Sequence, residues 1–78
     1  MEIYRATFGD RQCEIALERT HAGQGAVLAW ALGVRSDGKL EPLYGERGEI
    51  IREYADSRSE ALAAIRHRLI ALWGEERL

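Results

Sequence analysis

Hydrophobic and polar positions alternate along two segments near the start of the chain, and this alternation predicts a pair of antiparallel strands. The segments read IYRATF (residues 3–8) and RQCEIALERT (residues 11–20), with Gly9-Asp10 between them. Glycine beside aspartate is typical of a two-residue hairpin turn, and such a turn pairs Phe8 with Arg11. The apolar side chains then share one face: Tyr4, Ala6, Phe8, Cys13, Ile15 and Leu17. The other face is polar, with Arg5 opposite Glu14 and Thr7 opposite Gln12, as expected of a half-buried hairpin.

An unbroken apolar run, AVLAWALGV at residues 26–34, predicts a strand covered on both faces, with a buried helix as the rival interpretation. One face of this strand carries large side chains: Leu28, Trp30, Leu32 and Val34. The other carries mostly small ones: Val27, Ala29, Ala31 and Gly33. Asp37-Gly38 then indicates a second two-residue turn, which pairs Val34 with Glu41 and Gly33 with Pro42. Because proline lacks an N–H group, this fourth strand should lie at an edge or break at Pro42.

The last third of the chain predicts one helix. Ser57 and Glu60 have the spacing of a capping box, and Gly74 is typical of the residue that ends a helix. An apolar stripe recurs between them at three- and four-residue steps: Leu62, Ile65, Leu69 and Leu72. Residues 49–55 fit either a strand or a helical turn, with a short fifth strand favoured. The tail after Gly74 is expected to fray.

These elements predict an α+β two-layer sandwich in one small domain spanning residues 1–78. An antiparallel meander of four or five strands would carry the C-terminal helix on one face. We expect the helix to cover the face with the large side chains: Tyr4, Ile15, Leu17, Leu28, Trp30 and Leu32. The opposite face would then be polar on the first hairpin and apolar on the second.

That apolar half of the open face is the candidate interface. Its predicted members are Val27, Ala29, Ala31, Gly33, Leu40 and Tyr44. Residues 49–55 could cover it, or it could stay in contact with water, or another molecule could bind there. The leading hypothesis is a small non-enzymatic interaction module, a homodimer or a binder of a protein partner. On this hypothesis, Ala31→Arg should break the assembly and leave the fold intact.

Charge weighs against nucleic acid as the main partner. The chain of 78 residues has a net charge of −2 and a pI near 5.6, whereas proteins that bind the phosphate backbone are usually basic. The alternative function is a weak single-stranded nucleic-acid binder, with candidate contacts at Arg35, Tyr44, Arg47 and Arg52. Neither a leader nor an apolar run of membrane-span length is evident, so we expect a soluble cytoplasmic protein. Ten of the eleven basic residues are arginine, which indicates a GC-rich, bacterial genome.

Candidate chemistry is sparse, and we expect no catalytic residue, no cofactor and no metal. Cys13 is the sole cysteine, so an internal disulfide and a thiolate zinc site are both excluded. Its position among inward-facing residues predicts an inert buried thiol. His21 and His67 have no carboxylate or cysteine at metal-ligand spacing. Residues 23–25, GQG, are too short for a phosphate-binding loop.

One stretch resembles a known arrangement. YADSRSEALAAIRHRL, at residues 54–69, resembles the step from strand to helix that ends double-stranded-RNA-binding domains and HicB-type antitoxins. The likeness covers about a fifth of the chain and depends on common capping chemistry. The N-terminal helix and lysine cluster of the RNA-binding domain are missing. The resemblance therefore implies a local strand-to-helix step and assigns no functional residue.

Overall fold

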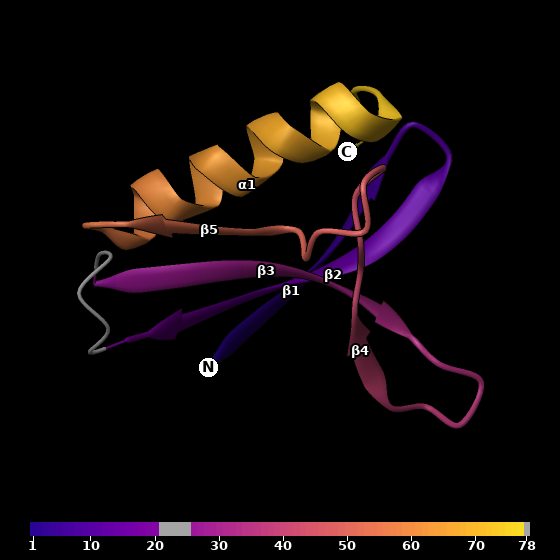
Figure 1. Cartoon of the computed structure of the whole chain (residues 1–78), viewed down its shortest axis with the longest axis horizontal. Helices are drawn as coiled ribbons and strands as arrows, with labels where there is room; N and C mark the ends of the chain where they lie inside the picture. Colours follow the sequence, from indigo (N-terminus) through magenta and orange to yellow (C-terminus); the bar gives the residue numbers. More distant parts are fainter. Residues whose placement is uncertain (21–25, 78) are drawn as a thin grey trace.

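The computed structural model describes residues 1–20 and 26–77, which form one antiparallel sheet with a single helix lying across it (Figure 1). The order along the chain is β1 (Glu2–Phe8), β2 (Arg11–Arg19), β3 (Val27–Val34), β4 (Leu40–Pro42), β5 (Arg52–Ala55), α1 (Arg58–Trp73) and β6 (Glu76–Arg77). The predicted α+β two-layer architecture is confirmed, with β6 as an additional strand.

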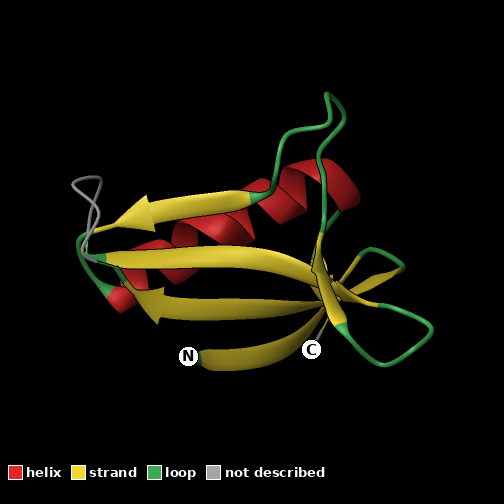
Figure 2. Cartoon of the chain, turned by 60° about the horizontal axis from the view of Figure 1, so that its bottom comes forward, coloured by secondary structure: helices red, strands yellow, loops and turns green. Residues whose placement is uncertain are grey.

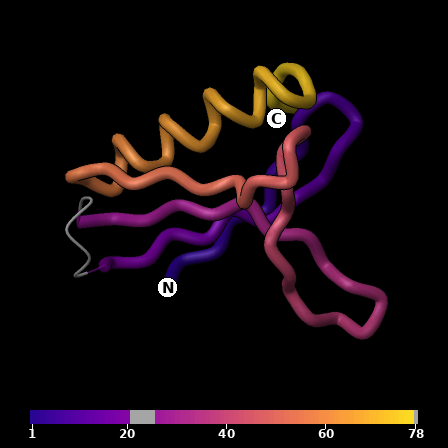
Figure 3. The backbone as a smooth tube through the Cα atoms, in the orientation of Figure 1, coloured from indigo at the N-terminus to yellow at the C-terminus, as the bar shows by residue number. Residues whose placement is uncertain are grey.

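The sheet has the spatial order β4-β3-β2-β1-β6, and β5 also pairs with β3 (Figure 2). β3 therefore has two partners on one side. Its first half, Val27–Trp30, pairs with β5, and its second half, from Leu32 to Val34, pairs with β4. The chain between β4 and β5 rises beside the C-terminal half of α1 (Figure 3). One edge of the sheet is formed by β4 and β5, and the other by β1 together with β6, which pairs with Thr7 and Phe8.

The first hairpin has the predicted register throughout, from Phe8 opposite Arg11 to Glu2 opposite Leu17. Gly9 begins the turn with a φ of 61°, a conformation that glycine adopts without steric cost. The expected pair of opposite charges is also formed, since Arg5 Nε lies 3.2 Å from Glu14 Oε1.

The helix begins and ends where the sequence indicates. The Ser57 hydroxyl accepts the Glu60 backbone N–H at 3.2 Å, and it donates to the Glu60 carboxylate at 3.0 Å. The Gly74 N–H donates to the Ile70 carbonyl at 2.9 Å and closes the last turn. The helical face that packs on the sheet buries Ala61, Ile65 and Leu69 completely.

The prediction of which β3 face the helix covers is wrong. In the β2–β3 register, Ile15 lies opposite Ala31 and Leu17 opposite Ala29, so the small side chains share the face of the first hairpin's core. Ala29 and Ala31 are fully buried in the same cluster as the helical core residues. Large side chains on neighbouring strands already fill this layer, and alanine on the central strand leaves room for the helix to approach. The large side chains of β3 therefore lie on the face without a helix.

The register of the second hairpin is also wrong, by one residue. Val34 pairs with Leu40 and Leu32 with Pro42, because the turn has three residues instead of two. The Arg35 N–H donates to the Lys39 carbonyl at 2.7 Å, and Gly38 has a φ of 86° at the end of the turn. Three-residue hairpin loops of this kind use a glycine in the left-handed region. A one-residue slip moves every side chain to the other face, so Leu40 and Pro42 join the large residues of β3.

The favoured strand in residues 49–55 is confirmed for Arg52–Ala55, and Ile50 forms a bridge with Tyr44. Ile51 between them is fully buried, and its carbonyl accepts the Ala31 N–H at 3.0 Å. The strand thus extends the sheet sideways and covers neither face. The fourth strand ends at Pro42, as predicted. The expectation of a frayed tail is wrong, because Glu76 and Arg77 pair with Phe8 and Thr7.

Candidate interaction surface

The sheet face opposite α1 carries a cluster of large apolar side chains, which we call the open-face patch. It comprises Met1, Ile3, Trp30, Leu32, Val34, Leu40 and Pro42. Alternation along the strands places these residues there, since their neighbours point into the core. Val34 is 59% exposed, Ile3 48% and Leu40 41%. In a chain this small, side chains of this size in contact with water form a substantial apolar surface.

The centre of the open-face patch is hollowed. A shallow depression of about 180 Å³ is lined by Met1, Ala16, Glu18, Trp30, Leu32 and Pro42. Trp30 is held in place by a hydrogen bond, because its indole Nε1 donates to Glu18 Oε1 at 3.1 Å. The polar edge of the indole is therefore satisfied within the chain, and the rest of the ring contributes apolar surface to the depression.

Charged groups lie around the open-face patch, and one of them, Glu18, lines its central depression. The Arg5–Glu14 pair lies on β1 and β2, and the Arg52 guanidinium on β5 lies 5.9 Å from the Tyr54 ring centroid. Both signs of charge are present, so the rim has no single-sign field. An apolar centre with a mixed polar rim is the anatomy of a protein–protein interface.

The structure separates the predicted interface residues. Val27, Ala29 and Ala31 are buried beneath the helix, so they contribute to the core and not to the surface. Gly33 lies on that same inner face, where an added Cβ would meet the Leu43 side chain. Leu40 belongs to the open-face patch.

Tyr44 lies away from the open-face patch. It is 59% exposed and lines a separate hollow of about 310 Å³ with Arg11, Leu72 and Trp73. The guanidinium of Arg11 stacks over the Trp73 ring there, 4.7 Å from its centroid. Tyr44 is therefore not part of the surface to which the sequence assigned it.

Sequence reasoning missed the residues that form the open-face patch. One face of the apolar run at residues 26–34 has large side chains and the other has small ones. The prediction placed the face with the large side chains beneath the helix. The β2–β3 register carries the missing information, because it places either the large or the small side chains with Ile15 and Leu17. The sequence between the two strands contains no recognisable turn motif, so the sequence did not define this register.

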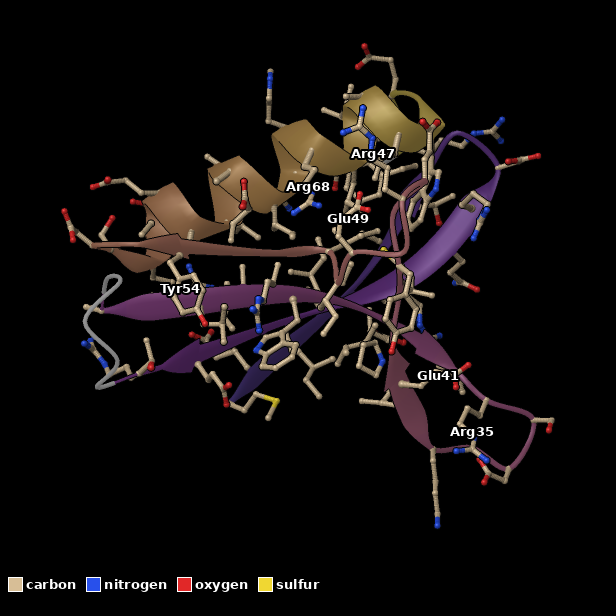
Figure 4. The ribbon with its side chains drawn as sticks, viewed as in Figure 1. Arg35, Glu41, Arg47, Glu49, Tyr54 and Arg68 are labelled. Carbon is tan, nitrogen blue, oxygen red and sulfur yellow. The ribbon has the colours of Figure 1, made fainter. Side chains whose placement is uncertain are left out.

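The candidate nucleic-acid contacts are not brought together. Arg35 lies at the end of the β3–β4 hairpin, and Arg47 lies beside the C-terminal half of α1, on the other side of the sheet (Figure 4). Arg35 is also 3.5 Å from Asp37, and the Arg47 N–H donates to Glu49. Arg52 and Tyr44 lie in further separate places, on the open face and in the Trp73 hollow. These four residues do not form one basic groove.

Chemically reactive groups are not assembled in the described part of the chain. Burial raises the pKa of the Cys13 thiol from 9.0 to about 11, with Glu14 and Glu76 adding to the shift and Arg11 opposing it. No group of three or more histidine, cysteine, aspartate or glutamate residues is placed to hold a metal among residues 1–20 and 26–77. His67 is exposed on the helix. His21 and the GQG segment lie outside the described residues.

No protein-family model matches the chain, and comparisons with curated proteins and with solved structures return no match. Within the described residues, no helix combines the length and the apolar character that crossing a membrane requires.

Proposed function

We propose that this chain is a non-enzymatic protein-interaction module that self-associates through the open-face patch. One observation carries the proposal: the large apolar side chains of β3 and β4 lie on the sheet face that α1 does not cover. In an α+β sandwich the helix normally covers the apolar face, and the second face is polar. Here both faces of β3 are apolar, and no helix of the described chain covers the second one, on which Leu28 is buried but Val34 and Leu40 stay exposed.

A second copy fits this surface because the surface provides both a projection and a depression. Val34 and Leu40 stand opposite each other on the β3–β4 hairpin, which extends beyond the sheet on the open side (Figure 1). The depression around Trp30 lies beside them on the same face. A two-fold axis lets each copy offer its hairpin to the other copy's depression, so one surface serves both sides.

A dimer interface of standard size would occupy a modest share of the surface of this chain. A standard interface buries about 800 Å² per partner, and the chain exposes 5273 Å² in total. An interface of that size would therefore cover about 15% of the exposed area of each copy. Each exposed apolar side chain removed from water contributes on the order of 1 kcal/mol.

Two variants with equal starting exposure test the proposal. Val34 and Tyr44 are both 59% exposed, but only Val34 belongs to the open-face patch. Val34→Arg should convert an associated species into a monomer of 8.8 kDa in light scattering, while Tyr44→Arg should not. Circular dichroism should show that both variants keep the fold. Equal masses for Val34→Arg and the wild type would contradict the proposal.

The nucleic-acid alternative has less support. Its candidate side chains are dispersed and the net charge is −2. A titration with a single-stranded oligonucleotide at low salt tests it directly, since electrostatic binding is strongest there. Binding at low salt that is lost in Arg52→Gln would favour it over the interaction module.

A further inference from the structure

The hollow between the end of α1 and the β4–β5 connection, which we call the Trp73 hollow, has the features of a small-molecule site. Its volume of about 310 Å³ is at the lower end of the range for such sites. Segments far apart in the sequence line it, namely the start of β2, the β4–β5 connection and the end of α1: Arg11, Tyr44, Gly45, Glu46, Leu72 and Trp73. None of these residues belongs to the open-face patch, so a ligand here would leave that patch free.

The wall formed by the β4–β5 connection is held by several hydrogen bonds. The Gly45 N–H donates to the Glu49 carbonyl at 2.7 Å. The Glu49 carboxylate accepts the Arg47 N–H at 3.0 Å and lies 3.6 Å from the Arg68 guanidinium of α1 (Figure 4). This wall is therefore already ordered, and a ligand would lose little affinity in ordering it.

The wall formed by α1 is fixed by two glycines. The Gly74 N–H donates to the Ile70 carbonyl at 2.9 Å, and Gly9 lies so close to the helix end that an added Cβ would overlap the Trp73 carbonyl oxygen. Arg11 follows Gly9 by two residues, and its guanidinium lies over the Trp73 ring, 4.7 Å from the ring centroid. Stacking on the ring holds the plane of the guanidinium in place.

The Arg11 guanidinium has no ion-pair partner among residues 1–20 and 26–77. Other arginines do have a carboxylate partner there: Arg5, Arg35, Arg58, Arg66 and Arg68. Because the Trp73 ring occupies one face of the Arg11 guanidinium, the N–H groups at its edge are left to bind an anion. A carboxylate fits their planar fork, so the hollow favours a ligand that carries one.

The other residues of the Trp73 hollow define the rest of the ligand. Tyr44 is 59% exposed and Leu72 is half-buried in the same hollow, so an aromatic ring placed there would remove apolar surface from water. Glu46 is exposed and adds a negative charge, which attracts an ammonium group and disfavours a phosphate.

We propose that the Trp73 hollow binds an aromatic α-amino acid as its zwitterion. Arg11 binds the carboxylate, Glu46 attracts the ammonium group, and the aromatic ring packs on Tyr44 and Leu72. This binding goes beyond the proposed self-association and does not depend on it.

Titration with L-phenylalanine at one protein concentration, followed by NMR, tests the site. The Trp73 indole N–H signal should shift and saturate with a dissociation constant on the order of 1 mM, as expected for a ligand of this size in an open site. The Trp30 indole N–H signal, from the open-face patch, is the internal control and should not move. L-Alanine has both charges and no ring, and it should cause no shift. A Trp73 signal that stays constant with L-phenylalanine, or moves equally with L-alanine, would overturn the proposal.

Two blocked derivatives separate a free amino acid from the end of a peptide. L-Phenylalaninamide lacks the carboxylate and should bind about tenfold more weakly, because hydrogen bonds between charged groups are among the strong ones. N-Acetyl-L-phenylalanine lacks the ammonium group and should bind about threefold more weakly, since Glu46 is exposed to solvent. Equal affinity of either derivative and L-phenylalanine would overturn the assignment of a zwitterion.

Matched variants assign the two charges. Arg11→Gln should weaken L-phenylalanine binding about tenfold, while Arg19→Gln, which removes another exposed arginine from β2, should leave it unchanged. Glu46→Gln should weaken L-phenylalanine binding about threefold and should not weaken binding of N-acetyl-L-phenylalanine. Wild-type affinity in Arg11→Gln would contradict the proposal.

Controls separate this site from the fold and from self-association. Circular dichroism should show that Arg11→Gln and Glu46→Gln keep the fold, because both side chains are exposed. Val34→Arg should bind L-phenylalanine as the wild type does. Failure of the ligand site is therefore distinguishable from failure of self-association.

Discussion

Enlarging a small side chain beneath the helix should destabilise the fold, and Ala31→Leu is the sharpest form of this change. Ala31 is fully buried, with its backbone bonded to Ile51 and Leu43 on one side. Leucine adds three carbon atoms to a layer already filled by residues of both hairpins and α1. Such overpacking costs about 1–3 kcal/mol. A chain of this length has roughly 4–12 kcal/mol of total stability, so the melting temperature should fall by about 4–8 °C for each kcal/mol lost.

Urea unfolding followed by circular dichroism measures the change in the free energy of unfolding. Val34→Leu is the matched control, because it enlarges a side chain on the opposite face of the same strand and should change stability by less than about 0.5 kcal/mol. Ala31→Arg buries an unpaired charge, which costs several kcal/mol, so we now expect it to unfold the chain. If Ala31→Leu were as stable as the wild type while Val34→Leu was strongly destabilised, our assignment of the two β3 faces would be refuted.

Three further predictions concern single residues. Ser57→Ala should cost about 1 kcal/mol in urea unfolding because the helix loses its N-terminal cap; an unchanged midpoint would show that the cap contributes little. Gly9→Ala should cost more than Gly38→Ala, since both have positive φ but only at Gly9 would a Cβ overlap the Trp73 carbonyl oxygen; equal losses would argue against close packing there. Cys13 should resist alkylation at pH 8 in the folded chain, because its pKa is raised to about 11. Since burial favours the protonated thiol, the stability contributed by this group should be complete below pH 9 and be lost as the pH rises towards 11; a Cys13→Ala variant with the same alkaline slope would disprove this.

Local patterns defined much of the fold. Gly9-Asp10 with alternating neighbours fixed the first hairpin, because turn length alone sets a hairpin register. Ser57, Glu60 and Gly74 fixed the helix, because each satisfies backbone groups within a few residues of itself. These signals need no knowledge of distant parts of the chain.

Long-range choices were harder to predict. Whether Trp30 or Ala31 faces the helix depends on how β3 pairs with β2, and the intervening segment contains no turn motif that defines this. Large side chains were assigned to the helix on the assumption that size follows burial. The structure follows the opposite rule at this strand, because space beneath a packed helix is limited. The predicted register of the second hairpin was wrong by one residue, because Gly38 fits a turn of either two or three residues.

These errors changed which residues form the apolar patch on the open face. An apolar patch was expected on the open face, and one exists there, but it consists of the large side chains. Of the predicted members, only Leu40 is retained. The principle that an uncovered apolar face marks an interface applies more strongly to Trp30, Leu32 and Val34 than to alanine and glycine, because larger side chains have more area to remove from water.

The two tryptophans provide the most direct test of the central claim that a second copy covers the open-face patch. Trp30 belongs to the patch, and Trp73 lies at the end of α1 beside Arg11. Their indole N–H signals can be followed by NMR in one sample over a dilution series. We predict that the Trp30 signal shifts with concentration along with the molar mass, while the Trp73 signal stays in place. A Trp30 signal that is constant while the mass changes would contradict the claim.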